Sequence, residues 1–210
     1  PVYGDTNPVD DNYPLLSWRF SDKAEWNVLD MRSNMKAIDN PAGHGHLAEA
    51  ILSTRLGRPL RVLEVGGNWG EVAKHYIGDA PCGLDYDVLE MEYKAKKFTE
   101  EHGGDPKWLR FIYNMRQCRK SYDIVAMSGV TPYIHDLYDM LVRLSKRAPK
   151  IIFCKTPVDN RTRVIMQGDY GYYRMLNKNK LDEAMGTMGF GETEAPLVSN
   201  AYINATYEKA

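Results

Sequence analysis

The order of apolar and polar positions changes near residue 59, and this change divides the chain into two parts. Residues 1–20 are rich in Pro, Asp and Asn and predict an irregular arm. Apolar positions then recur at loose helical spacing, and a clearer helix is expected from Gly45 to Leu56. We therefore predict an N-terminal arm and helical cap over residues 1–58, followed by one domain over residues 59–210.

Beyond this point short apolar runs alternate with amphipathic stretches, which is typical of an α/β protein with a parallel sheet and crossover helices. Strands are expected at Leu60–Val65, Leu84–Glu90, Leu109–Tyr113, Tyr122–Met127 and Lys150–Lys155. Helices are expected between them at Trp69–Ile77, Tyr93–His102 and Leu137–Arg147. The last quarter predicts a short strand at Arg163–Gln167, a helix from Asn177 to Met188 and a final strand at Tyr202–Tyr207.

Composition narrows the possible partners. Lys and Arg total 27 and Asp and Glu total 28, and this balance disfavours nucleic acid as the main partner. The three cysteines form no CxxC pair, so we expect free thiols in a reducing compartment. No apolar run approaches about 18 residues, and the N-terminus lacks the features of a signal peptide. We therefore expect a cytoplasmic protein without a membrane partner, and the oligomeric state stays open.

The segment RVLEVGGNWG, residues 61–70, carries the strongest chemical signal. An apolar strand ends near an acid, and a glycine-rich turn then opens a helix. Glycines let backbone N–H groups approach a ligand closely, and the start of a helix favours an anionic group. Ligands of open α/β sheets bind at the carboxyl ends of the strands, which is where this loop falls.

Two other cofactor motifs fail here. The phosphate-binding loop requires GxxxxGK[ST], and no Lys-Ser or Lys-Thr follows these glycines. The dinucleotide motif requires GxGxxG, but counting from Gly66 the third and sixth positions are Asn68 and Glu71. The remaining pattern, E-x-G-x-x-x-G with Glu64, Gly66 and Gly70, resembles motif I of the class I S-adenosylmethionine-dependent methyltransferases.

Longer segments sharpen this resemblance over roughly residues 60–190. They resemble a family of methyltransferases encoded in bacterial surface-polysaccharide and other biosynthetic gene clusters. The matching segments are LEVGGNWG (63–70), YDVLEMEYKAKKF (86–98), SYDIVAMSGVTPYIHD (121–136) and IIFCKTPV…VIMQ…YGYYR (151–174). Two positions depart from that family: Asn68 stands where it usually has glycine, and Asn114 stands where it often has an acid.

The resemblance implies a Rossmann-like class I methyltransferase sandwich, with helices on both faces of a mostly parallel sheet. It also implies S-adenosylmethionine as cofactor, and O- or N-methylation of a small molecule or sugar-type biosynthetic intermediate. The altered Asn68 and the lack of a recognisable base leave one alternative open, a non-catalytic scaffold that binds the cofactor or a nucleoside.

Each part of this cofactor needs a partner. Backbone N–H groups of the loop suit its carboxylate, and Glu64 suits its ammonium. An acid after the second strand suits the ribose diol, and here Asp85 and Glu90 compete. Glu90 is preferred because it ends the more apolar run. The complete predicted cofactor set is Glu64, Gly66, Gly67, Asn68, Trp69, Gly70, Asp85, Glu90, Met91, Asn114, Met115, Ser128 and Gly129.

The acceptor is expected to lie beyond the fourth strand, over residues 128–136. Tyr133 and His135 are the candidate catalytic residues, because imidazole suits proton transfer near neutral pH. His44 and His46, two positions apart, do not share a helix face and have no nearby Cys or Asp cluster, so no metal site is predicted; a contact near the cofactor is expected instead. The predicted acceptor-binding residues are Gln167, Tyr170, Tyr172, Tyr173 and Arg174.

Overall fold

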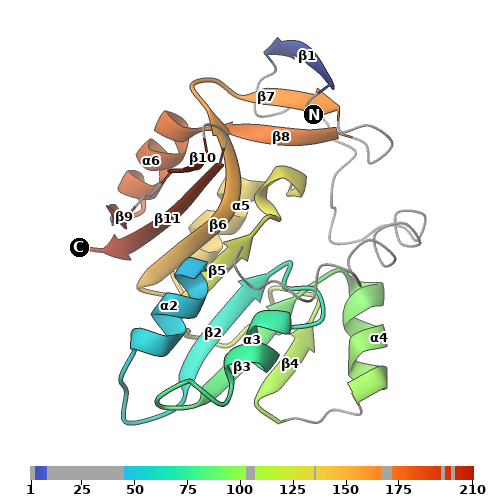
Figure 1. Ribbon diagram of the computed structural model, residues 1–210, viewed down its shortest axis with the longest axis vertical. Helices are drawn as coiled ribbons and strands as arrows, with labels where there is room; N and C mark the ends of the chain where they lie inside the picture. The colour runs from blue at the N-terminus through green and yellow to red at the C-terminus, as the bar shows by residue number, and fades with distance from the viewer. Residues whose placement is uncertain are drawn as a thin grey trace.

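The computed structural model describes residues 3–8, 45–102, 107–134, 136–166, 172–194, 197–199 and 202–210 (Figure 1). Three predicted site residues, His135, Gln167 and Tyr170, lie outside the described residues. The same holds for His44 and for most of the predicted N-terminal arm.

A parallel sheet forms the centre of the molecule. Its strands follow the order β4-β3-β2-β5-β6, and β11 then pairs antiparallel with β6 and with β9. The bounds are β2 Leu60–Val65, β3 Leu84–Leu89, β4 Leu109–Ile112, β5 Ile124–Ser128, β6 Lys150–Asp159, β9 Phe190–Glu194 and β11 Tyr202–Lys209. The predicted fold class, a Rossmann-like sheet of mostly parallel strands with helices on both faces, is confirmed.

Two apolar clusters hold the helices against the two faces of this sheet. Neighbouring residues of one strand point to opposite faces, so Ile152 of β6 joins one cluster and Phe153 joins the other. Helices α2 (Gly45–Ser53) and α3 (Glu71–Tyr76) cover the face of Ile152, and α5 (Leu137–Ser145) and α6 (Lys178–Thr187) cover the face of Phe153. Helix α4 (Glu92–His102) lies beside the edge strand β4 (Figure 1).

Strand β6 is longer than the sequence predicts because a β-bulge lets it change partners. Two residues, Cys154 and Lys155, stand opposite the single residue Asn204 of β11. Lys155 adopts a left-handed φ of 49°, and its N–H donates to Asn204 Oδ1 at 2.8 Å. The extra residue reverses the phase of the side chains, so Val158 lies in the same cluster as Phe153 although an odd number of positions separates them.

Past the bulge, Thr156 and Pro157 still pair with β11, and the last residues of β6 then pair with β8 (Tyr172–Asn177). Strand β8 belongs to a small antiparallel lobe with β7 (Arg163–Met166) and β1 (Tyr3–Pro8). Figure 1 shows this lobe above the carboxyl ends of the parallel strands. The prediction of an irregular arm is wrong for residues 3–8. Their sequence, YGDTNP, has no strand-like alternation, and pairing with β7 supplies the strand hydrogen bonds instead.

Three further strands were not predicted from the sequence. They are β8 in the lobe, β9 and the short β10 (Leu197–Ser199), which pairs with β11. Each forms its hydrogen bonds with a neighbouring strand, β8 with β7, and β9 and β10 with β11. None of the three has a long apolar run of its own, so the sequence pattern does not mark them.

Candidate functional site

The glycine loop between β2 and α3 turns sharply and rests against the end of β5. Gly66, Asn68 and Gly70 all have left-handed backbone, with φ of 72°, 49° and 70°. A Cβ built on Gly66 would lie 2.5 Å from Val130 Cγ2 and 2.7 Å from Val130 Cβ. Position 66 therefore requires glycine for two reasons, its φ angle and its contact with Val130.

Asn68, which departs from the resembling family, is compatible with this loop. Asparagine tolerates left-handed backbone better than most residues, since its short amide can hydrogen-bond locally. Here Asn68 Nδ2 donates to Glu71 Oε1 at 3.2 Å, in the first turn of α3. The loop conformation is thus kept without a glycine at position 68.

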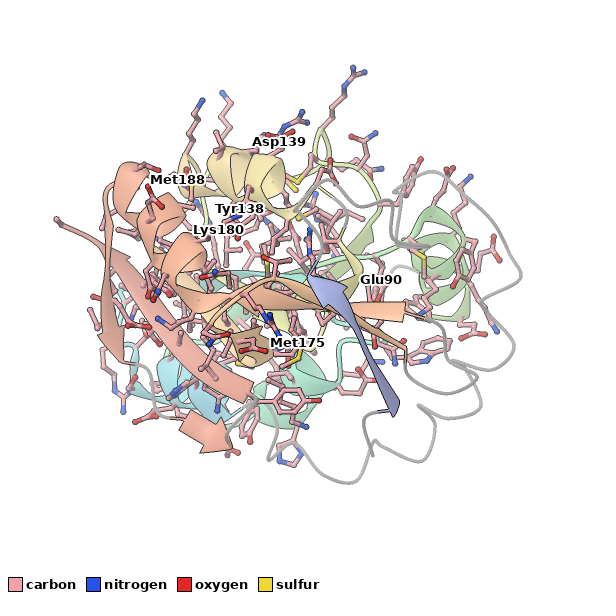
Figure 2. All side chains as sticks on the ribbon, turned by 90° about the horizontal axis from the view of Figure 1, so that it is seen from above. Glu90, Tyr138, Asp139, Met175, Lys180 and Met188 are labelled. Atoms are coloured by element: carbon pink, nitrogen blue, oxygen red, sulfur yellow. The ribbon has the colours of Figure 1, made fainter. Side chains whose placement is uncertain are left out.

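Glu90 lies directly after β3 and faces the loop. Its carboxylate accepts the N–H of Asn68 through Oε1 and the N–H of Met91 through Oε2, both at 3.0 Å. The residue is 3% exposed. Figure 2, which views the molecule from above, labels Glu90. The structure therefore brings Glu90 and the glycine loop together, and the assignment of Glu90 to the ribose diol stays a prediction.

Asp85 lies near the opposite end of the same strand. It is the second residue of β3 and pairs in register with Arg61, whereas Glu90 follows the strand's last residue. Five residues of extended strand separate the two acids by about 16 Å. Asp85 instead forms an ion pair with Arg119, so the structure removes it from the candidate cofactor set.

Asp87, also on β3, shares the partner of Asp85, because Arg119 forms an ion pair with each of them. It is fully buried and accepts hydrogen bonds from Arg110 Nε at 2.9 Å and from Tyr122 Oη at 2.6 Å. Buried carboxylates are tolerated only with such partners, so this network has a structural role.

Glu64 forms the floor of the loop. Its side chain is 1% exposed and accepts a hydrogen bond from the Tyr86 hydroxyl at 2.9 Å. Burial raises the pKa of this carboxyl group to about 8, against the lowering effect of the Tyr86 hydrogen bond. A Cβ built on Gly67 would lie 2.7 Å from Glu64 Cδ, so the backbone passes directly over the carboxyl group. Tyr86 was missed in the sequence, because only the strand register brings it to Glu64.

The carboxyl end of β4 is closed by its own turn. Asn114 Oδ1 accepts the N–H of Arg116 at 2.9 Å, and Gln117 Oε1 accepts the N–H groups of Tyr113 and Asn114 at 2.9 and 3.1 Å. Asn114 is exposed, and the half-buried Met115 packs against the core. Both residues follow β4 at the same edge of the sheet as Glu90.

The end of β5 forms the other side of the candidate site. Ser128 ends the strand, and the Gly129 N–H donates to the Cys154 carbonyl at 2.9 Å, with a φ of 62° at Gly129. A single 3-10 turn, η3 (Thr131–Tyr133), follows and carries the half-buried Tyr133. The chain here is thus held by the neighbouring strand.

Arg174, predicted to bind the acceptor, is 2% exposed, and its Nη2 donates to the Ile134 carbonyl at 2.8 Å. This bond ties β8 of the lobe to the loop after η3. Tyr172 and Tyr173 lie on β8 in the same lobe. Arg174 therefore has a structural role here. Acceptor binding by Tyr172 and Tyr173 stays a prediction.

Two further observations limit the chemistry of the described residues. No group of three or more His, Cys, Asp or Glu side chains among them is arranged to hold a metal ion. Within the same part of the chain, no helix combines the length and apolar character needed to cross a membrane.

No protein-family model matches the sequence, and no curated protein sequence matches it. Solved structures do match. The 1,6-didemethyltoxoflavin-N1-methyltransferase of Burkholderia thailandensis, solved with 1,6-didemethyltoxoflavin and S-adenosylhomocysteine, is 18% identical with a TM-score of 0.59. That match covers 97% of this chain and 94% of the other.

Two more structures show the same likeness. The magnesium protoporphyrin IX methyltransferase of Synechocystis PCC 6803, solved with S-adenosylmethionine, is 15% identical with a TM-score of 0.56, over 91% of this chain and 88% of the other. An S-adenosylmethionine-dependent methyltransferase of Mesorhizobium loti is 11% identical with a TM-score of 0.59, over 82% of this chain and 100% of the other. The chain therefore has the fold of class I S-adenosylmethionine-dependent methyltransferases.

Proposed function

We propose that this protein is an S-adenosylmethionine-dependent methyltransferase that acts on a small molecule or sugar-type biosynthetic intermediate by O- or N-methylation. One observation carries the proposal. Glu64, the glycine loop and Glu90 meet at the carboxyl edge of the sheet, where each can serve a different part of the cofactor. Structures of the same fold from Burkholderia and Synechocystis hold S-adenosylhomocysteine or S-adenosylmethionine, which supports this choice.

The residues fit the amino-acid end of this cofactor. A buried carboxyl group with a raised pKa, such as Glu64, gains stability as a carboxylate when a cation arrives beside it. Among the loop N–H groups, Asn68 donates to Glu90, Gly70 donates to the Gly67 carbonyl, and Trp69 interacts with Glu71. The Gly67 N–H is therefore the candidate donor to the cofactor carboxylate.

The residues also fit the nucleoside end. The Glu90 carboxylate is held by the backbone N–H groups of Asn68 and Met91, and a carboxylate is an acceptor that suits the hydroxyls of a ribose. Met91 follows Glu90, and Asn114 and Met115 follow β4, so all three stand beside the expected adenine position. We assign them to adenine contacts as part of this proposal.

Bound S-adenosylmethionine supplies a methyl group that its sulfonium already activates. The main task of the protein is then to hold the reacting groups in line and to exclude water. The contact of Gly66 with Val130 fixes the loop against the end of β5, and Arg174 fixes the chain after η3. Tyr133, on η3, is our candidate for contacting the molecule that receives the methyl group. His135 remains the proposed general base.

Calorimetry tests this function. The free protein is titrated with S-adenosylmethionine and S-adenosylhomocysteine, and candidate acceptors are then screened for release of S-adenosylhomocysteine. Turnover with a small-molecule acceptor supports the proposal. Binding without turnover on any acceptor favours the non-catalytic scaffold, and failure to bind either compound contradicts both functions.

A further inference from the structure

We propose that His46, in the first turn of α2, donates a hydrogen bond to the carboxylate of the bound ligand's amino-acid part. This inference rests on the proposed function, because it assumes a ligand that carries an amino acid. It adds a residue from outside the sheet to the site built by Glu64 and the glycine loop.

The packing of α2 places His46 near the floor of that site. The backbone N–H of the next residue, Leu47, interacts with the Cys154 sulfur, and the Glu64 carboxyl group lies close enough to raise the pKa of that thiol. Cys154 pairs with Ser128 in the sheet, and its carbonyl accepts the Gly129 N–H. The start of α2 therefore packs on β6 at Cys154, which lies level with the last residue of β5, and Glu64 lies within electrostatic range of the same thiol.

The environment of the imidazole points to a ligand. The His46 side chain is 11% exposed, and its Nε2 atom is shielded from solvent. In the part of the chain that the structure describes, Nε2 has no hydrogen-bond partner. Nδ1 lies 3.9 Å from Glu49 Oε2, which is beyond hydrogen-bond distance. A buried polar atom of this kind is costly unless something binds it.

The chemistry of an amino acid explains why a donor is needed here. Its ammonium group is matched by Glu64, and one carboxylate oxygen is matched by the Gly67 N–H. The second carboxylate oxygen needs another donor, and neutral histidine can provide one from Nε2. A donor placed on α2 also makes the helix part of the binding site, so that ligand and helix stabilise each other.

Comparing two ligands by calorimetry tests this inference. S-adenosylhomocysteine carries the amino acid, whereas 5′-methylthioadenosine keeps the nucleoside and the sulfur without it. In His46→Leu we expect the affinity for S-adenosylhomocysteine to fall about tenfold or more, because a hydrogen bond to a charged group is lost. The affinity for 5′-methylthioadenosine should stay within about twofold of the wild type.

Three further variants sharpen the comparison. His46→Gln keeps an N–H donor of similar reach and should recover most of the affinity for S-adenosylhomocysteine. His46→Asn carries its donor near the Nδ1 position, so it should bind as weakly as His46→Leu and serves in its place if the leucine variant does not fold. His75→Leu is the matched control, since His75 is an exposed histidine on α3, and it should bind both ligands normally.

The possible failures are distinguishable. An unchanged affinity of the His46 variants for S-adenosylhomocysteine overturns the role of His46 alone. Equal losses for both ligands also overturn it, since they indicate a general effect on the pocket. If the wild-type protein binds neither ligand, the proposed function fails, and this inference fails with it.

Discussion

Replacing Glu64 with glutamine tests the electrostatics of the site most directly. Glutamine has nearly the same shape and still accepts the hydrogen bond that the Tyr86 hydroxyl donates. It has no proton to lose. We expect the free Glu64→Gln protein to be more stable than the wild type above neutral pH, and its stability to depend less on pH.

The magnitude follows from two pKa values, 4.5 for an ordinary solvated glutamate and about 8 for Glu64 in the folded protein. Between these values the unfolded chain has lost the proton and the folded protein keeps it. Wild-type stability therefore falls as pH rises, by about 1.4 kcal/mol for each pH unit. Over the full interval the loss is at most about 5 kcal/mol, a large share of the roughly 5–15 kcal/mol typical of a domain.

Urea unfolding at pH 5, 6.5 and 8 measures the effect. The midpoints of wild type and Glu64→Gln should lie close together at pH 5 and separate progressively at the higher values. Glu183→Gln, at an exposed glutamate on α6, is the control and should follow the wild type. A difference between wild type and Glu64→Gln that does not change with pH would refute the reasoning, because it would mean that Glu64 ionises normally in the folded protein.

Further expected outcomes concern the loop, the strand end and the bulge. Gly66→Ala should lower the melting temperature and weaken S-adenosylhomocysteine binding, because it strains the left-handed backbone and collides with Val130; a normal melt would contradict the contact. Glu90→Ala should weaken S-adenosylhomocysteine binding by at least about tenfold in calorimetry. Asp85→Asn should change stability through Arg119 and leave that affinity unaltered, and the reverse pattern would exchange the two assignments. Lys155→Gly should raise stability by about 1 kcal/mol in urea unfolding, since glycine adopts the left-handed φ without strain, and a loss of stability would show that the Lys155 side chain outweighs this strain.

The sequence alone was sufficient to predict the five parallel strands and the sharp turn at the glycine loop. Both are encoded locally: an apolar run such as Leu60–Val65 shows that both faces of a strand are buried, and the glycines after Glu64 mark a sharp turn. Glu90 was also preferred from the sequence, since a run of apolar positions shows where a strand ends.

The tertiary structure decided the features that depend on distant partners. The strand register brings Tyr86 to Glu64 and carries Asp85 away from the loop. The bulge at Lys155 is stabilised by Asn204, which lies 49 residues later. The sequence around Lys155 therefore does not predict it. The His46 side chain is largely buried in the folded protein, and the sequence around it does not predict this burial. The spacing of apolar residues predicts which side of a helix or strand is buried. The partner of a buried polar group depends on long-range packing, which this spacing does not contain.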